Sequence, residues 1–298
     1  MSVSSTVRLF GAALTAWWDD NGPRLGASLA YYTLFAIAPV LLVAIAIAGM
    51  VFGAEAVRGE IVGQLDELVG TDGARAVQAL LEGASRRQSG IVATILGSIT
   101  FVLAATGAFL ELQVALNTIW RVKPNPSANL WAFTLDRLRS FGLVVAIGFL
   151  LTVSLAVSAA LAALSGWLDR LVPGWPILWQ GINMLVSLAV ITVLFAMLYR
   201  FLPDVRLRWR DVATGAFVTA LLFTVGKQLI GLYLGRSSTT STYGAAGSVI
   251  VLLLWVYYSS QIVLLGAEFT RLYAQREGVR PQPEEFAEKD PDAPRKAT

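Results

Sequence analysis

Long runs of apolar residues recur along the chain, and the short segments between them hold most of the charges. A helix that crosses a membrane needs about 20 mostly apolar residues, because the hydrocarbon core is roughly 30 Å thick. Runs of this length lie at about residues 28–52, 90–118, 140–165, 177–200, 212–234 and 246–270. The pattern therefore predicts an all-α, polytopic membrane helix bundle with six transmembrane helices, in a domain that covers residues 26–275.

Two amphipathic segments flank the first predicted span. Residues 1–25 place large apolar side chains on one helical stripe, namely Val7, Phe10, Leu14, Trp17 and Trp18. This stripe predicts an interfacial helix along the membrane surface. In residues 54–89 apolar side chains recur at helical spacing in two short series, Val57, Ile61, Leu65 and Leu68, then Val77, Leu80, Leu81 and Ala84. They predict an amphipathic helical hairpin that lies on the membrane surface or caps the bundle.

No further span is predicted at either end of the chain. Residues 1–25 lack the apolar core of about 7 to 15 residues that marks a cleavable signal peptide, so we expect the first span to act as the targeting signal. The last residues hold four prolines after Gly278 and show no apolar periodicity. This composition predicts a disordered tail over residues 276–298.

Composition restricts the chemistry. The chain is 56% hydrophobic and 14% charged, whereas soluble domains carry about 25% charged residues. It contains neither cysteine nor histidine. Disulfides, thiolate nucleophiles, imidazole bases and the usual zinc or copper sites therefore require side chains that this sequence does not hold. We expect a protein that is not an enzyme, with no cofactor and no metal.

The basic residues predict the orientation. If the N-terminus is cytoplasmic, the inner segments hold 16 Lys and Arg residues and the outer loops hold 6. This asymmetry follows the positive-inside rule and places both termini in the cytoplasm, with the hairpin of residues 54–89 outside. Because topology explains the positive charge, we expect the lipid bilayer as the partner and no nucleic acid.

Several polar side chains fall inside the predicted spans. A charged group at the centre of a membrane helix costs about 2.5 to 3.5 kcal/mol, so each one needs a physical reason. One interpretation is a polar pathway through the bundle, lined by Glu111, Lys227, Gln113, Asn117, Asn183, Gln228, Gln261 and Glu268. The other is that the amides only pack neighbouring helices, Lys227 extends outward, and Glu268 ends a helix beside Arg271 or Arg121.

Two further features are open to a functional or a structural interpretation. Pro39 interrupts the backbone hydrogen bonds of the first span and is either a hinge or a fixed packing kink. Before the sixth span lies a candidate loop for an anion or lipid headgroup, made of Arg236, Ser237, Ser238, Thr239, Tyr243, Gly244 and Ser248. Hydroxyls and free backbone N–H groups beside an arginine suit a phosphate, although an ordinary solvated loop fits the same residues.

Four stretches carry a family resemblance: SLAYYTLFAIAPVLLVAIAIAG at 28–49, LNTIW at 116–120, YRFLPDVRLRWRD at 199–211, and TYGAAGSVIVLLLWVYYSSQIVLLGAEFTRLYA at 242–274. In these stretches the chain resembles the YihY/BrkB family of bacterial inner-membrane proteins. The resemblance implies a six-span protein of the bacterial plasma membrane. It also brings an older family label, ribonuclease BN. A zinc-dependent tRNA-processing nuclease needs clustered histidines and aspartates, so we reject ribonuclease activity for a chain without histidine.

Two functions remain in view. The leading hypothesis is a transporter or a translocator of lipids or other amphiphiles that uses the polar intramembrane residues. The alternative is a non-transporting scaffold or envelope-integrity protein, in which the outer hairpin and the tail recruit partners. Pairs of small residues four apart, such as Gly231 and Gly235, suit close helix packing within one chain or in a homo-oligomer. The sequence identifies no substrate.

Overall fold

The computed structural model describes residues 3–86, 91–125, 176–236, 245–279, 281–285 and 287–291. The helices are α1 (Val3–Asp19), α2 (Gly22–Phe52), α3 (Ala54–Arg86), α4 (Ile91–Trp120), α6 (Pro176–Phe201), α7 (Trp209–Arg236) and α9 (Ala245–Arg276). The strands are β1 (Val122–Pro124), β2 (Val205–Arg206), β3 (Gln282–Pro283) and β4 (Ala287–Lys289). β1 pairs with β4 and β2 pairs with β3, both antiparallel.

Four stretches of helix are long and apolar enough to cross a membrane, judged by length and composition: Gly22–Leu42, Met184–Phe201, Trp209–Tyr233 and Gly247–Arg276. They coincide with the first, fourth, fifth and sixth predicted spans. The second predicted span falls on the single helix α4, and the third, at 140–165, lies outside the described residues. The helical membrane class is thus confirmed. The count of six spans and the location of the termini remain predictions.

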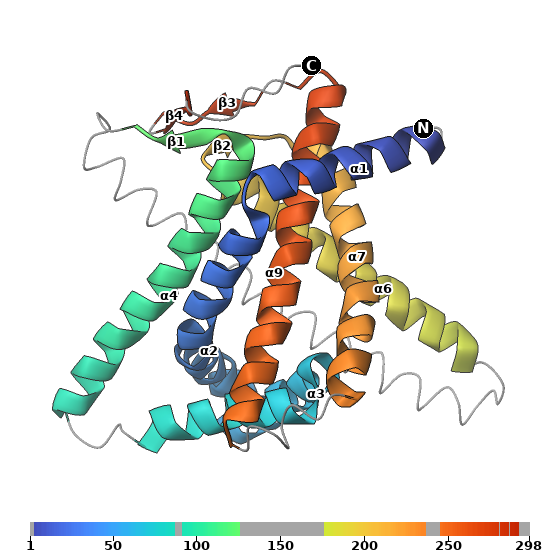
Figure 1. The fold of residues 1–298 in the computed structure, drawn as a ribbon. Coiled ribbons are helices and arrows are strands. Elements are labelled where there is room, and N and C mark those ends of the chain that lie inside the picture. The colour runs from blue at the N-terminus through green and yellow to red at the C-terminus, as the bar shows by residue number, and fades with distance from the viewer. Residues whose placement is uncertain are drawn as a thin grey trace.

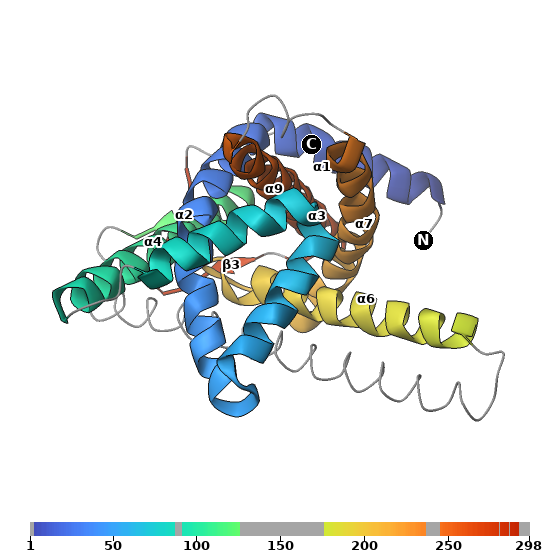
Figure 2. The same ribbon diagram turned by 90° about the horizontal axis from the view of Figure 1, so that it is seen from below.

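The helices are arranged around α9, which contacts α1, α2, α3, α4 and α7 (Figure 1). α2 packs on α4 along one side, and α6 packs on α7 along the other. α1 crosses the bundle at the end where the four strands gather, which we call the strand end. α3 lies across the opposite end, called here the α3 end, and bends sharply in the view of Figure 2. That bend is at Gly70, whose φ of 77° suits a residue without a Cβ atom.

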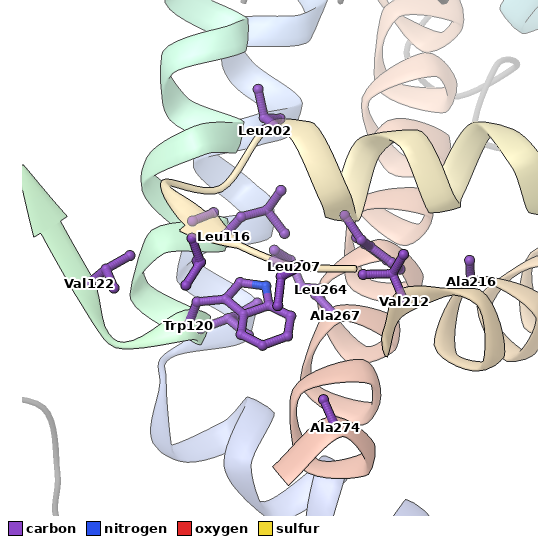
Figure 3. Close-up of a cluster of buried hydrophobic side chains, with 14 of the residues drawn as sticks. Leu116, Trp120, Val122, Leu202, Leu207, Val212, Ala216, Leu264, Ala267 and Ala274 are labelled. Carbon is purple, nitrogen blue, oxygen red and sulfur yellow. The ribbon is translucent and has the colours of Figure 1, made fainter. Parts of the chain in front are cut away.

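Two clusters of buried apolar side chains hold the bundle together. At the strand end, Leu116 and Trp120 of α4 meet Leu202, Leu207 and residues of α9 (Figure 3). Towards the α3 end, the second cluster joins α2, α3 and α9 and contains Ala30, Ile45, Val57, Ala76, Val77, Leu81, Leu252 and Val256. The polar side chains described below lie mostly beside the first cluster.

The two amphipathic segments form helices. α1 buries Ala13 and Ala16 and exposes Val7, Leu14 and Trp18. α1 lies across the strand end (Figure 1), and its position at a membrane surface remains a prediction. Residues 54–86 are helical on both sides of Gly70, while the side of a membrane on which they lie remains a prediction.

The C-terminal segment differs from the predicted disordered tail. α9 continues to Arg276, and residues 281–285 and 287–291 contain β3 and β4. The N–H groups of Glu284 and Asp290 donate to the carbonyl oxygens of Asp204 and Arg121, both at 3.0 Å. These partners lie far away in sequence, so a proline-rich composition without periodicity gives no sign of them. Residues 292–298 lie outside the described part of the chain.

Candidate functional site

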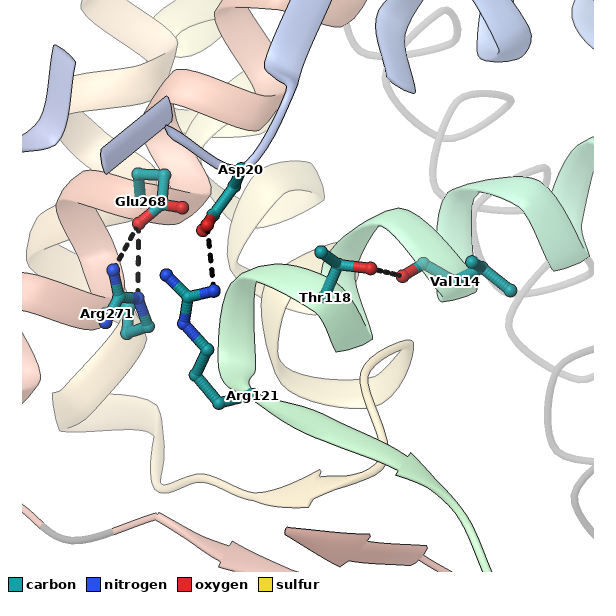
Figure 4. Close-up of polar contacts among 6 residues, drawn as sticks. All are labelled: Asp20, Val114, Thr118, Arg121, Glu268 and Arg271. Atoms are coloured by element: carbon teal, nitrogen blue, oxygen red, sulfur yellow. Dashed lines mark hydrogen bonds and ion pairs between the residues drawn. The ribbon is translucent and has the colours of Figure 1, made fainter. Parts of the chain in front are cut away.

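Two acidic and two basic side chains meet at the strand end, where the α1–α2 turn approaches α4 and α9 (Figure 4). Arg121 Nη1 lies 2.8 Å from Asp20 Oδ1. Arg271 donates from Nε and Nη2 to Glu268 Oε2, at 3.1 and 2.7 Å. We call Asp20, Arg121, Glu268 and Arg271 the charge cluster. The first ion pair joins the α1–α2 turn to the end of α4, and the second lies within α9.

Burial makes the charge cluster unusual. The side chains of Asp20 and Glu268 are 2% and 0% exposed, so both carboxyl groups are almost fully removed from solvent. Only one oxygen of each faces an arginine. Asp20 Oδ2 and Glu268 Oε1 are buried and receive no hydrogen bond from a donor in the described residues. Groups of this kind are expensive to bury without a partner.

A third buried carboxylate, that of Asp204, lies on the connection from α6 to β2. Gln113 Nε2 donates to Asp204 Oδ1 at 2.8 Å, and Asn117 Nδ2 donates to Asp204 Oδ2 at 2.6 Å. In return, the Asp204 N–H donates to Asn117 Oδ1 at 2.9 Å. Gln113 and Asn117 are four residues apart and therefore share one face of α4. The two predicted amides are thus brought together, and both hold the loop that carries Asp204.

Three further polar contacts join α6 or the first two helices to their neighbours. Ser28 of α2 donates to Glu111 of α4. Trp17 Nε1 of α1 donates to Gln261 Oε1 of α9 at 3.1 Å. The Tyr199 hydroxyl of α6 donates to the carbonyl oxygen of Val263, on α9, at 2.7 Å. Glu111 and Gln261, two of the predicted residues, are thus engaged in contacts between helices.

Lys227 is the exception among the predicted charged residues. It lies on α7 inside the candidate span Trp209–Tyr233, and its side chain is half-buried. It forms no hydrogen bond or ion pair with any residue that the structure describes. Its neighbour Gln228 is exposed. Glu111, whose carboxylate accepts from Ser28, does not pair with Lys227 in the described part of the chain.

The remaining predicted residues have fewer observations. α2 continues as one helix through Pro39, so a hinge there remains a prediction. Asn183 lies on α6, but its side chain falls outside the described part. In the candidate anion loop, Arg236 ends α7 and Ser248 lies half-buried in the first turn of α9. The other members of that loop, Ser237, Ser238, Thr239, Tyr243 and Gly244, lie outside the described residues.

The sequence did not predict four residues that bind the predicted polar side chains: Asp20, Asp204, Ser28 and Trp17. Asp20 and Asp204 lie in polar connections outside the predicted spans, where an acidic residue is ordinarily solvated. A short polar turn beside a run of apolar residues was the only signal. The prediction that Glu268 pairs with Arg271 or Arg121 is resolved in favour of Arg271.

Residues 13–291 match the family model described as Virulence factor BrkB. The chain belongs to the BrkB family. This confirms the resemblance seen in the sequence, and with the apolar helices it makes the chain an integral membrane protein.

Curated BrkB-family relatives are named UPF0761 membrane proteins. The chain is 31% identical to RSc1559 of Ralstonia nicotianae over 86% of this chain and 56% of that protein. It is 32% identical to a Verminephrobacter eiseniae protein, over 84% of this chain and 58% of the relative. YihY of Escherichia coli O1:K1 / APEC is 33% identical, over 59% of this chain and 58% of YihY. The chain thus spans a little over half the length of these relatives. No solved structure matches it.

Proposed function

We propose that this BrkB-family chain translocates an anionic amphiphile, such as an acidic phospholipid, and that Lys227 receives the negatively charged headgroup. The observation that carries the proposal is the state of Lys227: a charged group in a candidate span, half-buried, without a partner in the described part of the chain. Placing a charged side chain near the centre of a membrane helix costs about 2.5 to 3.5 kcal/mol of insertion free energy. A bound anion would offset part of the cost of burying the Lys227 ammonium group.

The surroundings of Lys227 support access from the lipid. The same helix exposes Leu221, Val225, Leu229, Leu232 and Tyr233. An apolar exposed face inside a candidate span suits contact with acyl chains. Lys227 lies six residues before Tyr233, at the end of the candidate span, which is roughly 9 Å along the helix axis. A lipid headgroup that reaches Lys227 from that end therefore crosses only part of the membrane. The adjacent exposed amide of Gln228 supplies donors for phosphate oxygens.

The decisive experiment measures lipid movement directly. We would reconstitute the full chain into liposomes that contain a trace of fluorescent phosphatidylglycerol and add dithionite, which quenches only the outer leaflet. The proposal expects more quenching than in protein-free liposomes. Lys227→Met should lower the rate about tenfold, the change that corresponds to about 1.4 kcal/mol of lost ion-pair interaction. Glu111→Gln tests the other predicted charge in the same assay.

Two controls make the result specific. Lys289→Met removes a positive charge from an exposed residue of β4, and should leave the rate unchanged. Fluorescent phosphatidylcholine, which carries no net charge, should move more slowly than phosphatidylglycerol. Equal quenching by the protein and by empty liposomes, with the protein folded and inserted, would rule out lipid translocation.

One observation favours the alternative, a non-transporting scaffold or envelope-integrity protein. Gln113, Asn117, Gln261, Glu111 and Glu268 all have protein partners, as expected if polar side chains serve only to pack helices. Under this alternative neither Lys227→Met nor Glu111→Gln alters lipid movement. The dithionite assay therefore separates the two functions.

A further inference from the structure

The charge cluster contains an arrangement that its two ion pairs do not explain. Glu268 and Asp20 carry one oxygen each that no donor reaches, although both are buried. The oxygen of Glu268 that faces away from Arg271 points toward Asp20 (Figure 4), so the two carboxyl groups face each other. Two carboxylates facing each other without a proton repel and leave two acceptors unsatisfied.

One proton removes both problems. When a carboxyl group is protonated it gains an O–H donor and keeps an acceptor oxygen. A proton on Glu268 Oε1 or Asp20 Oδ2 therefore lets one group donate to the other. The outer oxygens remain bound to Arg121 and Arg271, so no ion pair has to break.

We propose that Asp20 and Glu268 form a proton-binding site, in which the two carboxyl groups share one proton and thereby hold the α1–α2 turn against α9. Loss of the proton to solvent leaves two like charges in contact and separates the turn from the helix. Arg121, whose side chain is 23% exposed, marks the side of the cluster from which solvent reaches it. The inference does not depend on translocation of lipids.

The elements packed around the cluster bring other charged groups near these two carboxyl groups. α4 contributes Arg121, and α9 contributes Glu268 and Arg271. α7 meets a different face of α9, where Gly215 and Thr219 face Thr270 and Gly266. Asp204 is engaged by Gln113 and Asn117, and Asp211 of α7 contacts Arg208.

The first test detects the proton. Infrared spectra of the full chain in lipid nanodiscs should show the carbonyl stretch of a protonated carboxyl group, and this band should disappear as the pH is raised. Glu268→Gln should lack the band at every pH, because its amide donates permanently to Asp20. Glu285→Gln alters a carboxylate that is 88% exposed and should retain the band. Identical spectra for the natural chain and Glu268→Gln would overturn the proposal.

The second test detects the movement. Because the chain has no cysteine, spin labels attach only at introduced ones, and Arg24→Cys on α2 with Gln275→Cys on α9 places two at exposed positions of the strand end. The distance between the labels should increase as the pH is raised. In the Glu268→Gln background it should stay constant. A distance that does not change with pH in the natural background would overturn the proposal even if the infrared band were present.

Discussion

At the scale of single residues, the contact between α7 and α9 depends on small side chains. A Cβ atom at Gly266 would collide with the side chains of Thr219 and Tyr199, and one at Gly215 would collide with Thr270. Close approach of this kind is how helices gain packing energy in a membrane, where the hydrophobic effect between helices is weak. Beside this contact, the Tyr199 hydroxyl of α6 donates to the Val263 carbonyl oxygen of α9 at 2.7 Å.

Gly266→Ala should therefore destabilise the protein. The added methyl group forces the buried Thr219 and Tyr199 side chains out of place, which costs about 1 to 3 kcal/mol. The measurement is thermal unfolding in detergent, followed by tryptophan fluorescence. Gly231→Ala is the matched control on α7, because a Cβ atom there meets nothing within 4 Å. A Gly266→Ala protein as stable as the Gly231→Ala protein would contradict the packing argument.

Asn117 is the second residue with a large expected effect. It donates to the Asp204 carboxylate and accepts from the Asp204 N–H, so Asn117→Ala removes both hydrogen bonds inside a buried site. We expect a loss of about 2 to 4 kcal/mol in the free energy of unfolding, because the bond to the carboxylate contributes about 1.5 to 3 kcal/mol and the neutral bond from the N–H about 0.5 to 1.5 kcal/mol. Thr118→Ala, which alters only a contact within α4, is the control for urea or thermal unfolding. Equal losses in the two variants would show that the amide does not stabilise the loop.

At the scale of elements, the helices were predictable and the strands were not. Apolar runs of membrane length give a strong signal, and α2, α6, α7 and α9 lie where the sequence predicts spans. β1 to β4 have two or three residues each and pair with strands far away in the sequence, so no local periodicity marks them. The residues of the candidate site also divide into predictable and unpredictable ones. Residues inside spans, such as Gln113 and Glu268, stand out by polarity, whereas Asp20 and Asp204 in connections do not.

The C-terminal strands make an element-scale prediction. A chain that ends after Val279 loses β3 and β4, and with them the backbone bonds to Asp204 and Arg121. We expect a loss of about 1 to 3 kcal/mol in stability, since each hydrogen bond contributes about 0.5 to 1.5 kcal/mol. A chain that ends after Pro291 retains both strands and serves as the control. Thermal unfolding compares the two, and equal unfolding temperatures would mean that the strands do not stabilise the bundle.

At the scale of the whole molecule, polar and apolar contacts are distributed unevenly. The charge cluster, the Asp204 site and the strands all lie at the strand end, whereas α3 packs on the other end mainly through apolar residues. Because α9 runs from one end to the other, the two ends should lie on opposite sides of a membrane. The positive-inside count predicts that the strand end faces the cytoplasm.

This orientation can be tested with single cysteines in a chain that has none of its own. Gly63→Cys lies on an exposed part of α3, where a Cβ atom meets nothing within 4 Å, and Gln275→Cys lies on the exposed end of α9. In intact spheroplasts a membrane-impermeant maleimide should label Gly63→Cys and leave Gln275→Cys unlabelled until the membrane is permeabilised. The reverse pattern would invert the topology, and labelling of both in intact cells would place the two ends on the same side. The expected pattern would also place the charge cluster at the cytoplasmic end of the bundle, so that its shared proton would exchange with the cytoplasm.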